Sequence, residues 1–376
     1  MKEQLVQVID KKDLQVLILT DGYNIHHLSG YRGHTGMLVA FQGEQYILTD
    51  SRYTEQVELE APEFTCVDIG REGYSKTIAA MVQKAFAKEG RSTLRIGFEN
   101  KEISYMQYQA FVDTFAKELT GMQVEFVPLE DAVNVYREVK TEDEIAKLAR
   151  AEQIGDEAFT EIVKFIHENW KDGLTEQRVA LQLEYEMRLR GAEGTSFDTI
   201  AASGSNSSLP HAMPQPKLLT EGDFLTMDFG CMYQGYCSDM TRTIHIGEVV
   251  ESEQKKVYDT VLQAQLAALS VVKPGMVCSD VDKCARDIIA DAGYGDYFGH
   301  GLGHSVGLFI HEEPRFSMKC DAVLKPGVVI TVEPGIYLPG RFGVRIEDMI
   351  VVTEDGYQNL CLLYTSPSPR DPKTSR

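Results

Sequence analysis

The sequence predicts two domains, an α/β domain at residues 1–135 and an α+β domain at residues 136–360, and three observations support this prediction. The chain has 376 residues, which is more than one hydrophobic core usually holds. Short apolar runs alternate with helical patterns in the first part, whereas long amphipathic helices begin near residue 140. A strand pattern then occurs twice in the second part, which indicates a duplicated sheet unit.

The first domain combines strand and helix patterns. The runs LQVLIL, GMLVAF and QYILTD have the length and apolar character of buried strands, and SKTIAAMVQKAFAKEG has the period of an amphipathic helix. Strands that alternate with helices are typical of an α/β domain.

The second domain is predicted to open with a long helix. Thr141 and Glu144 form a capping box that starts it. Its apolar face comprises Ile145, Leu148, Ile154, Phe159, Ile162 and Phe165. Thr175 caps a second amphipathic helix that stops at Gly191. The apolar residues of this second helix are Val179, Leu181, Leu183, Tyr185 and Leu189. Two further helices are expected at residues 253–271 and 280–292.

The repeated strand pattern carries acidic residues in register. Residues 219–230 read LTEGDFLTMDFG and residues 324–335 read LKPGVVITVEPG, so that Asp228 and Glu333 occupy the same position. Each is followed by a second acid on a returning strand, Asp239 in YCSDMTRT and Glu347 in GVRIEDMI. A pseudo-twofold arrangement of two such hairpin units would bring the four carboxylates together.

Four converging carboxylates predict a metal site. A single buried acid can be satisfied by backbone donors, but four carboxylates a few ångströms apart repel one another and need a counter-charge. His304, in GHGLGHSVGLFIHEE, would add one nitrogen ligand. An oxygen-rich set with one imidazole suits manganese, cobalt or zinc, and two such ions with bridging carboxylates are typical of two-metal hydrolases.

Three other motifs do not support an alternative chemistry. Asp228-Phe229-Gly230 is a triplet found in kinases, but no HRD segment accompanies it. His300 and His304 have the spacing of a helical zinc pair, but the intervening Gly-Leu-Gly disfavours a helix. The glycines of this segment lack the spacing of a dinucleotide-binding loop.

Composition excludes several classes of partner. The formal net charge of -20 repels nucleic acid and anionic membranes. No apolar run approaches the ~20 residues that cross a bilayer, and the first residues lack the features of a signal peptide. The seven cysteines are scattered without a CxxC pair, which predicts reduced thiols. We therefore expect a cytoplasmic protein without membrane or nucleic-acid partners.

Over residues 1–360 the sequence resembles the creatinase/aminopeptidase P/prolidase family of "pita-bread" metallopeptidases. The family's five metal ligands fall in the segments MDFG, SDMTRT, HGLGHSVG, VEPG and RIED, on Asp228, Asp239, His304, Glu333 and Glu347. NIHHLSGYRGHTGMLVAF with ILTDSRYTEQ looks like the family's creatinase-type N-terminal domain. The resemblance implies an α+β pita-bread catalytic domain and two divalent ions, manganese before cobalt or zinc. It also implies that Glu333 lies beside the attacking water and shuttles its proton.

Residues outside the metal set also match the family. The resemblance places His211, His300 and His311 against the substrate, where imidazoles can hydrogen-bond the scissile carbonyl. Each histidine taken alone is more often structural. Arg345 precedes Glu347 by two residues and so shares its strand face, where it would partner a ligand carboxylate.

The expected function is that of an Xaa-Pro aminopeptidase, which acts on peptides that have a free N-terminus and proline in second position. The principal alternative is an Xaa-Pro dipeptidase, because the same ligands and histidines serve both enzymes. Creatinase-type hydrolysis and a catalytically silent binding protein are further alternatives. The family resemblance also implies a homodimer.

The last residues are expected to be foreign to the protein. CLLYTSPSPRD, at 361–371, matches one translated frame of a common sequencing-library adapter. We therefore expect residues 361–376 to be a non-native tail, with the natural C-terminus missing after about Leu360. A disordered Pro/Ser tail is the alternative.

Overall fold

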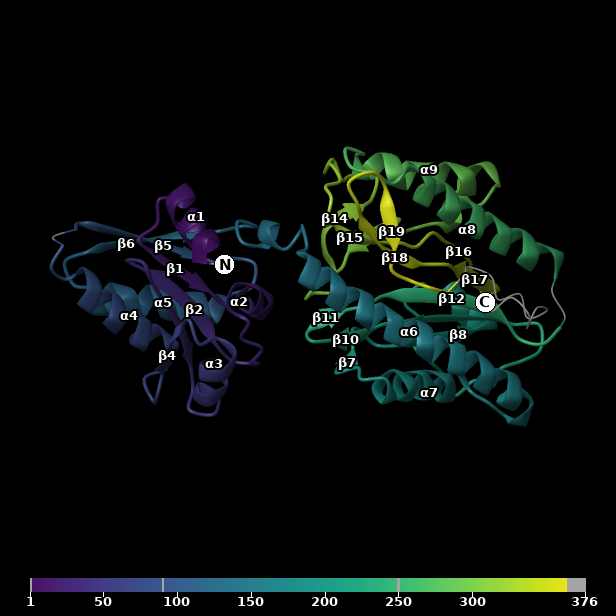
Figure 1. Cartoon of the computed structure of the whole chain (residues 1–376), viewed down its shortest axis with the longest axis horizontal. Helices are drawn as coiled ribbons and strands as arrows, with labels where there is room; N and C mark the ends of the chain where they lie inside the picture. Colours follow the sequence, from purple (N-terminus) through teal and green to yellow (C-terminus); the bar gives the residue numbers. More distant parts are fainter. Residues whose placement is uncertain (1, 90, 249–250, 364–376) are drawn as a thin grey trace. The chain divides into compact units, whose positions relative to one another are not determined.

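The computed structural model describes residues 2–89, 91–248 and 251–363 (Figure 1). The chain separates into two compact units, one that ends at Arg137 and one that begins at Glu138. Each unit has hydrophobic clusters of its own. The site described below lies entirely in the second unit.

The first unit is a six-stranded mixed sheet with helices on both faces. The sheet order is β4-β3-β2-β1-β5-β6, with β1, β5 and β6 parallel to one another. Its strands are β1 (Val16–Leu19), β2 (Met37–Phe41), β3 (Glu44–Thr49), β4 (Thr65–Asp68), β5 (Thr93–Phe98) and β6 (Gln123–Pro128). Its helices are α1 (Lys2–Lys12), α2 (Gly22–Ser29), α3 (Thr54–Glu60), α4 (Gly73–Phe86) and α5 (Tyr105–Glu118), with a 3₁₀ turn at Asn134–Tyr136.

The residues of the central strand β1 are all buried, on alternating faces of the sheet. Leu17 and Leu19 belong to the cluster that α1, α2 and α3 cover, whereas Val16 and Ile18 belong to the cluster under α4 and α5. Successive strand residues point to opposite faces, so a strand buried on both sides is apolar throughout. The predicted α/β character of this unit is confirmed.

Two helix pairs cover the second unit. They are α6 (Glu142–Asn169) with α7 (Glu176–Leu189), and α8 (Ser252–Val271) with α9 (Cys278–Asp291). The predicted capping box starts α6, because Thr141 Oγ1 accepts the Glu144 N–H at 3.3 Å and the Glu144 carboxylate accepts the Thr141 N–H at 2.8 Å. All four predicted helices are present.

The apolar residues of α7 divide between a buried side and an exposed side. Leu181, Tyr185 and Leu189 of α7 are 63, 55 and 62% exposed, whereas the buried side of the helix carries Val179 and Leu183. Residues four apart share a helix face, so the five apolar residues assigned to α7 from the sequence belong to two different faces.

Short sheets form the centre of the second unit. Three sheets have the orders β11-β10-β7, β12-β9-β8 and β14-β13-β15-β18-β19, and β16 pairs with β17. The strands of the first half are β7 (Gly194–Thr195), β8 (Ile200–Ser203), β9 (Phe224–Phe229), β10 (Cys231–Tyr233), β11 (Tyr236–Cys237) and β12 (Met240–His245). Those of the second half are β13 (Gly303–Ser305), β14 (Glu312–Phe316), β15 (Val329–Val332), β16 (Gly335–Leu338), β17 (Phe342–Arg345), β18 (Asp348–Val352) and β19 (Tyr357–Asn359).

The two halves repeat one hairpin unit. In each half a long strand is followed by a small hairpin and an antiparallel return strand, β9 to β12 and β15 to β18. The turn glycines before the long strands match, with φ of 90° at Gly222 and 85° at Gly327. Their N–H groups bond the carbonyls of Ile246 and Val352 at 2.9 and 2.8 Å. The duplicated unit predicted from the sequence is present, as expected for the pita-bread α+β fold.

No helix within the described residues is long and apolar enough to cross a membrane. The tail predicted to be foreign lies outside the described residues from position 364 onward. Cys361 is described and buried, and its thiol lies 3.1 Å from Asp156 Oδ1.

Candidate metal centre

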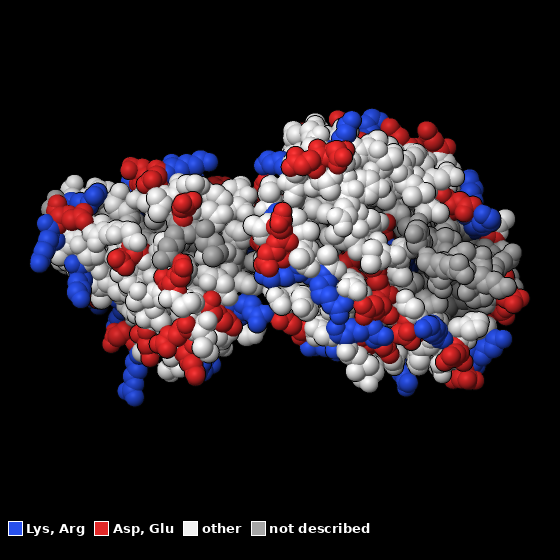
Figure 2. Space-filling view, viewed as in Figure 1, with Lys and Arg blue, Asp and Glu red and all other residues white. Residues whose placement is uncertain are grey.

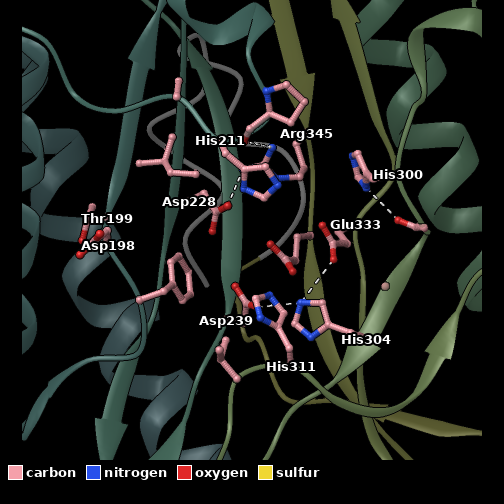
Figure 3. Close-up of a pocket in the computed structure, with 18 of the residues that line it drawn as sticks. Asp198, Thr199, His211, Asp228, Asp239, His300, His304, His311, Glu333 and Arg345 are labelled. Carbon is pink, nitrogen blue, oxygen red and sulfur yellow. Dashed lines mark hydrogen bonds and ion pairs between the residues drawn. The ribbon is translucent and has the colours of Figure 1, made fainter. Parts of the chain in front are cut away.

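The five candidate ligands line one cavity of about 540 Å³ in the second unit. Figure 3 labels four of them, Asp228, Asp239, His304 and Glu333. The first half contributes Asp228 from β9 and Asp239 from the residue before β12. The second half contributes His304 from β13, Glu333 from the residue after β15, and Glu347 from the residue before β18. The hairpin repeat therefore places one acid near the end of each long strand and one before each return strand.

The donor atoms are close enough to share a cation. His304 Nε2 lies 3.4 Å from Asp239 Oδ2 and 3.5 Å from Glu333 Oε1. One donor atom each from Asp239, His304 and Glu347 lie within 4.8 Å of one another. Asp228 Oδ1 is buried and has no hydrogen-bond partner among the described residues. Because a buried carboxylate oxygen without a partner is costly, these residues fit a site for divalent cations.

The tautomer of His304 suits a metal ligand. Its Nδ1 lies 3.2 Å from the Ser305 carbonyl, which can only accept, so the neutral ring carries its proton on Nδ1. The lone pair of Nε2 then faces the carboxylates. Burial, with a smaller effect from His311, lowers the pKa of His304 to about 3, so the ring is neutral at physiological pH.

The carboxylates are protonated more readily than usual without a counter-charge. Burial and then the charge of Glu347 raise the pKa of both Asp239 and Glu333 well above the ordinary range. Burial and then Asp228 raise the pKa of Glu347 to about 8. A divalent cation favours the charged form of its ligands. Oxygen donors with one imidazole suit hard or borderline divalent ions.

Thr241 and Tyr337, which the sequence analysis did not single out, orient the ligands. Thr241 Oγ1 donates to Glu347 Oε2 at 2.6 Å and accepts from Arg345 Nε at 3.0 Å. Arg345 also contacts Asp228 through Nη2 and donates from Nη1 to the Tyr337 hydroxyl at 2.8 Å. The only available sequence signal is proximity, since Thr241 follows one ligand by two residues and Tyr337 follows another by four.

Both ring nitrogens of His300 are engaged in this network. Nδ1 lies 2.8 Å from the Gly301 carbonyl and Nε2 lies 2.9 Å from the Tyr337 hydroxyl. Because the carbonyl can only accept, Nδ1 carries the proton and Nε2 accepts from the tyrosine. Burial and then Arg345 lower the pKa of His300 to about 4. The neutral ring therefore forms part of the cavity wall, and its N–H group already donates to the Gly301 carbonyl.

His211 and His311 lie closer to the open part of the cavity. His211 is exposed, and His311 packs its ring at 4.5 Å and 72° against the ring of His304. No hydrogen bond between described residues engages either ring. Burial and then Arg315 lower the pKa of His311, so it is neutral. Figure 3 shows His211, His300 and His311 around the carboxylates.

Arg315 of β14 is a second cation at the cavity that the sequence analysis missed. Its Nε lies 3.0 Å from Glu313 Oε1, and the side chain is 45% exposed. Nη2 lies 3.5 Å from the His311 carbonyl. Arg345 is committed to Asp228 and Tyr337, so Arg315 is the more accessible guanidinium for a ligand.

Comparison with known proteins defines the class of this fold and site. Residues 146–354 match metallopeptidase family M24, and residues 2–139 match the creatinase/prolidase N-terminal domain. The chain belongs to metallopeptidase family M24, which confirms the family resemblance drawn from its sequence.

Individual relatives extend over nearly the whole chain. The Xaa-Pro dipeptidase of Pyrococcus furiosus is 37% identical over 95% of this chain and 96% of its own length. The structure of an Xaa-Pro dipeptidase from Bacillus anthracis is 37% identical, with a TM-score of 0.87 over 97% of this chain and 98% of the other. An X-Pro aminopeptidase structure from Thermotoga maritima is 35% identical, with a TM-score of 0.84 over 96% of this chain and 99% of the other.

Proposed function

We propose that this metallopeptidase is an Xaa-Pro dipeptidase, which hydrolyses the bond between an amino-terminal residue and a carboxyl-terminal proline. The observation that carries the proposal is the combination of a carboxylate-rich metal site with an accessible arginine, Arg315, at one cavity. The dipeptidase relatives from Pyrococcus furiosus and Bacillus anthracis support it.

The metal centre would be held by Asp228, Asp239, His304, Glu333 and Glu347. Two divalent cations, manganese first and cobalt or zinc as alternatives, would supply a water nucleophile at neutral pH and Lewis-acid stabilisation of the developing oxyanion. Glu333 accepts a hydrogen bond from Thr331 Oγ1 at 3.3 Å, and its carboxylate could take the proton of the attacking water through an oxygen that does not bind metal. The same carboxyl group can then protonate the proline nitrogen as the bond breaks.

The histidines have different parts in this proposal. His211 and His311 are free to donate to the scissile carbonyl oxygen, which becomes more negative in the transition state. His300 shapes the wall of the cavity, because its own N–H is bound to Gly301. Arg345 holds Asp228 in orientation for metal binding.

The two termini of a dipeptide suit the two sides of this cavity. Its neutral α-amine has a lone pair that suits the metal side, and its terminal carboxylate suits Arg315, since guanidinium groups bind carboxylates in a paired geometry. A longer peptide has a neutral peptide bond in place of that carboxylate. Arg315 therefore favours dipeptides over longer peptides.

An Xaa-Pro aminopeptidase is the second candidate. The X-Pro aminopeptidase structure from Thermotoga maritima favours it, because it matches this chain almost as well as the dipeptidase structure does. We also propose, on the basis of the family resemblance and composition, a cytoplasmic homodimer.

A matched pair of substrates tests the proposal. Ala-Pro and Ala-Pro-amide differ only in the terminal charge, and Ala-Pro-Ala adds a residue. We expect Ala-Pro to be the best substrate of the three with manganese present. Arg315→Met should raise KM for Ala-Pro on the order of tenfold and leave Ala-Pro-amide unchanged.

The control variant is Arg341→Met, which removes an exposed arginine paired with Glu253 away from the cavity. It should leave both substrates unchanged. Equal or faster cleavage of Ala-Pro-Ala by the unaltered enzyme would favour the aminopeptidase, and no cleavage of any peptide would remove both candidates.

A further inference from the structure

An ion pair on α9 reaches into the loop that carries His300. Asp282 is fully buried and accepts Nε and Nη2 of Arg286 at 2.8 and 2.9 Å. Arg286 also donates to the carbonyls of Phe298 and His300, at 3.0 and 2.8 Å, and its guanidinium lies 4.3 Å from the centre of the Phe298 ring. One arginine therefore holds its acid and two carbonyl groups of the loop at once.

The acid of the pair holds the same loop from the other side. Asp282 Oδ1 accepts the N–H of Leu302 at 3.0 Å. The Leu302 carbonyl in turn accepts the N–H of Glu333 at 2.8 Å. The backbone of the loop between Phe298 and His304 is thus fixed on both sides of His300. The hydrogen bond at the Leu302 carbonyl also connects the loop to Glu333, a candidate metal ligand.

The ring of His300 depends on this backbone. It packs edge-on against Phe298, with ring centroids 5.0 Å apart, and its Nδ1 bonds the next carbonyl, that of Gly301. The remaining contact is the Tyr337 hydroxyl, which Arg345 shares. A small shift of the loop would move Nε2 away from Tyr337.

We propose that Asp282 and Arg286 are positioning residues for the peptidase reaction, which act through the backbone of residues 298–302 to place His300 in the cavity wall. This inference rests on the proposed function. Neither residue lines the cavity described above. A displacement of about 1 Å at a positioned group is enough to cost a large factor in rate.

The competing explanation is that the pair only stabilises the helix. Lys283 and Asp287 on the same helix form an ordinary ion pair between residues four apart. Their side chains are 67 and 58% exposed. They make a matched control, because Lys283→Met removes a charge from the same helix without touching the loop. An exposed pair of this kind contributes little to stability.

Arg286→Lys is the decisive variant. Lysine keeps the positive charge beside Asp282, so the fold should persist, but its single ammonium cannot serve the carboxylate and two carbonyls in one plane. We expect kcat for Ala-Pro to fall about tenfold or more, with KM, metal content and melting temperature close to those of the unaltered enzyme. Lys283→Met should leave all four quantities unchanged.

A double-mutant cycle identifies the route of the effect. If Arg286 acts through His300, Arg286→Lys should cost less than about twofold in a His300→Ala background. An equal loss in both backgrounds would overturn the proposal, as would full activity of Arg286→Lys or a loss that only follows unfolding.

Hydrogen exchange tests the same inference without catalysis. The amide of Leu302 should exchange faster in Arg286→Lys and at the original rate in Lys283→Met. Unchanged exchange at Leu302 would overturn the proposal even if activity fell. A failure of the proposed function would appear separately, as absence of peptidase activity in the unaltered enzyme with the exchange difference intact.

Discussion

At the scale of single residues, the hydroxyl group of Thr241 connects the candidate metal ligand Glu347 with Arg345. Thr241 is fully buried and uses both its donor and its acceptor capacity, toward Glu347 and Arg345 respectively. A buried hydrogen-bonding group of this kind orients its partners as well as stabilising them.

Thr241→Val should weaken metal binding by about tenfold to a hundredfold, because Glu347 would lose the bond that fixes its carboxylate. Valine matches the shape of threonine, so cavity formation does not complicate the comparison. Calorimetric titration with manganese measures the change. Thr241→Ser keeps the hydroxyl and should bind manganese nearly as well as the unaltered protein, and equal weakening in both variants would contradict this role.

Glu99 makes the first unit sensitive to pH. It is 4% exposed and accepts the backbone N–H groups of Thr20 and Asp21 and the amide of Asn24. Burial nevertheless raises its pKa from 4.5 to about 7. The folded state therefore holds this proton more tightly than the unfolded chain does.

The sign of the effect follows from linkage. Glu99 is protonated in both states below pH 4.5, and its stabilising contribution is lost as the pH rises toward and through 7. The shift corresponds to roughly 3 kcal/mol. We expect the difference in unfolding free energy between the unaltered protein and Glu99→Gln to change by about that amount between pH 4.5 and 8. Urea unfolding at several pH values measures it, and a constant difference would contradict the assignment.

At the scale of secondary-structure elements, the position of His304 depends on close contact between two strands. A Cβ atom added at Gly303 would lie 2.0 Å from the Thr331 carbonyl oxygen of β15. His304 is the next residue, and its N–H bonds Thr331 Oγ1 at 3.1 Å. Strand β13 can approach β15 this closely only with glycine at position 303.

Gly303→Ala should therefore destabilise the protein by on the order of 3 kcal/mol and displace His304 from the carboxylates. Chemical denaturation measures the first effect and metal titration the second. Gly299→Ala is the control for stability, because a Cβ atom there meets nothing within 4 Å. Similar losses for both alanine variants would contradict the role of this strand contact.

The sequence predicted the four helices and the repeated hairpin of the second unit and named the candidate ligands and Arg345, but it did not reveal the other groups that orient the ligands. Asp228 and Glu333 could be paired because each stands in a strand motif whose local pattern repeats. Arg315 and Tyr337 contact the site only through the tertiary fold, and Arg286 reaches a loop beyond the end of its own helix. Local periodicity contains no information about such approaches.

At the scale of the whole molecule, we expect metal binding and folding to be coupled in the second unit only. All five candidate ligands belong to the second unit, and the first unit has separate hydrophobic clusters. A ligand that binds only the folded state stabilises the part of the protein that binds it.

Chelation should abolish peptidase activity and lower the unfolding temperature of the second unit, while the first unit unfolds as before. At a cation concentration a hundredfold above Kd the stabilisation amounts to about 2.7 kcal/mol. Manganese or cobalt should restore both properties. Calorimetry beside the activity assay checks this prediction. Full activity after verified removal of all metal would contradict the proposed chemistry.

The hairpin repeat is symmetric in its acids but not in its nitrogen ligand. Strand β8 pairs with β9 as β13 pairs with β15, yet β8 reads IAAS and only β13 contributes a histidine. Two cations bound between the halves would therefore experience different chemistry, one of them with an imidazole and the other with oxygen atoms alone. The position with the imidazole favours borderline ions, and the position with oxygen ligands alone favours hard ions. The protein should consequently fill its two positions stepwise and accept a different metal in each.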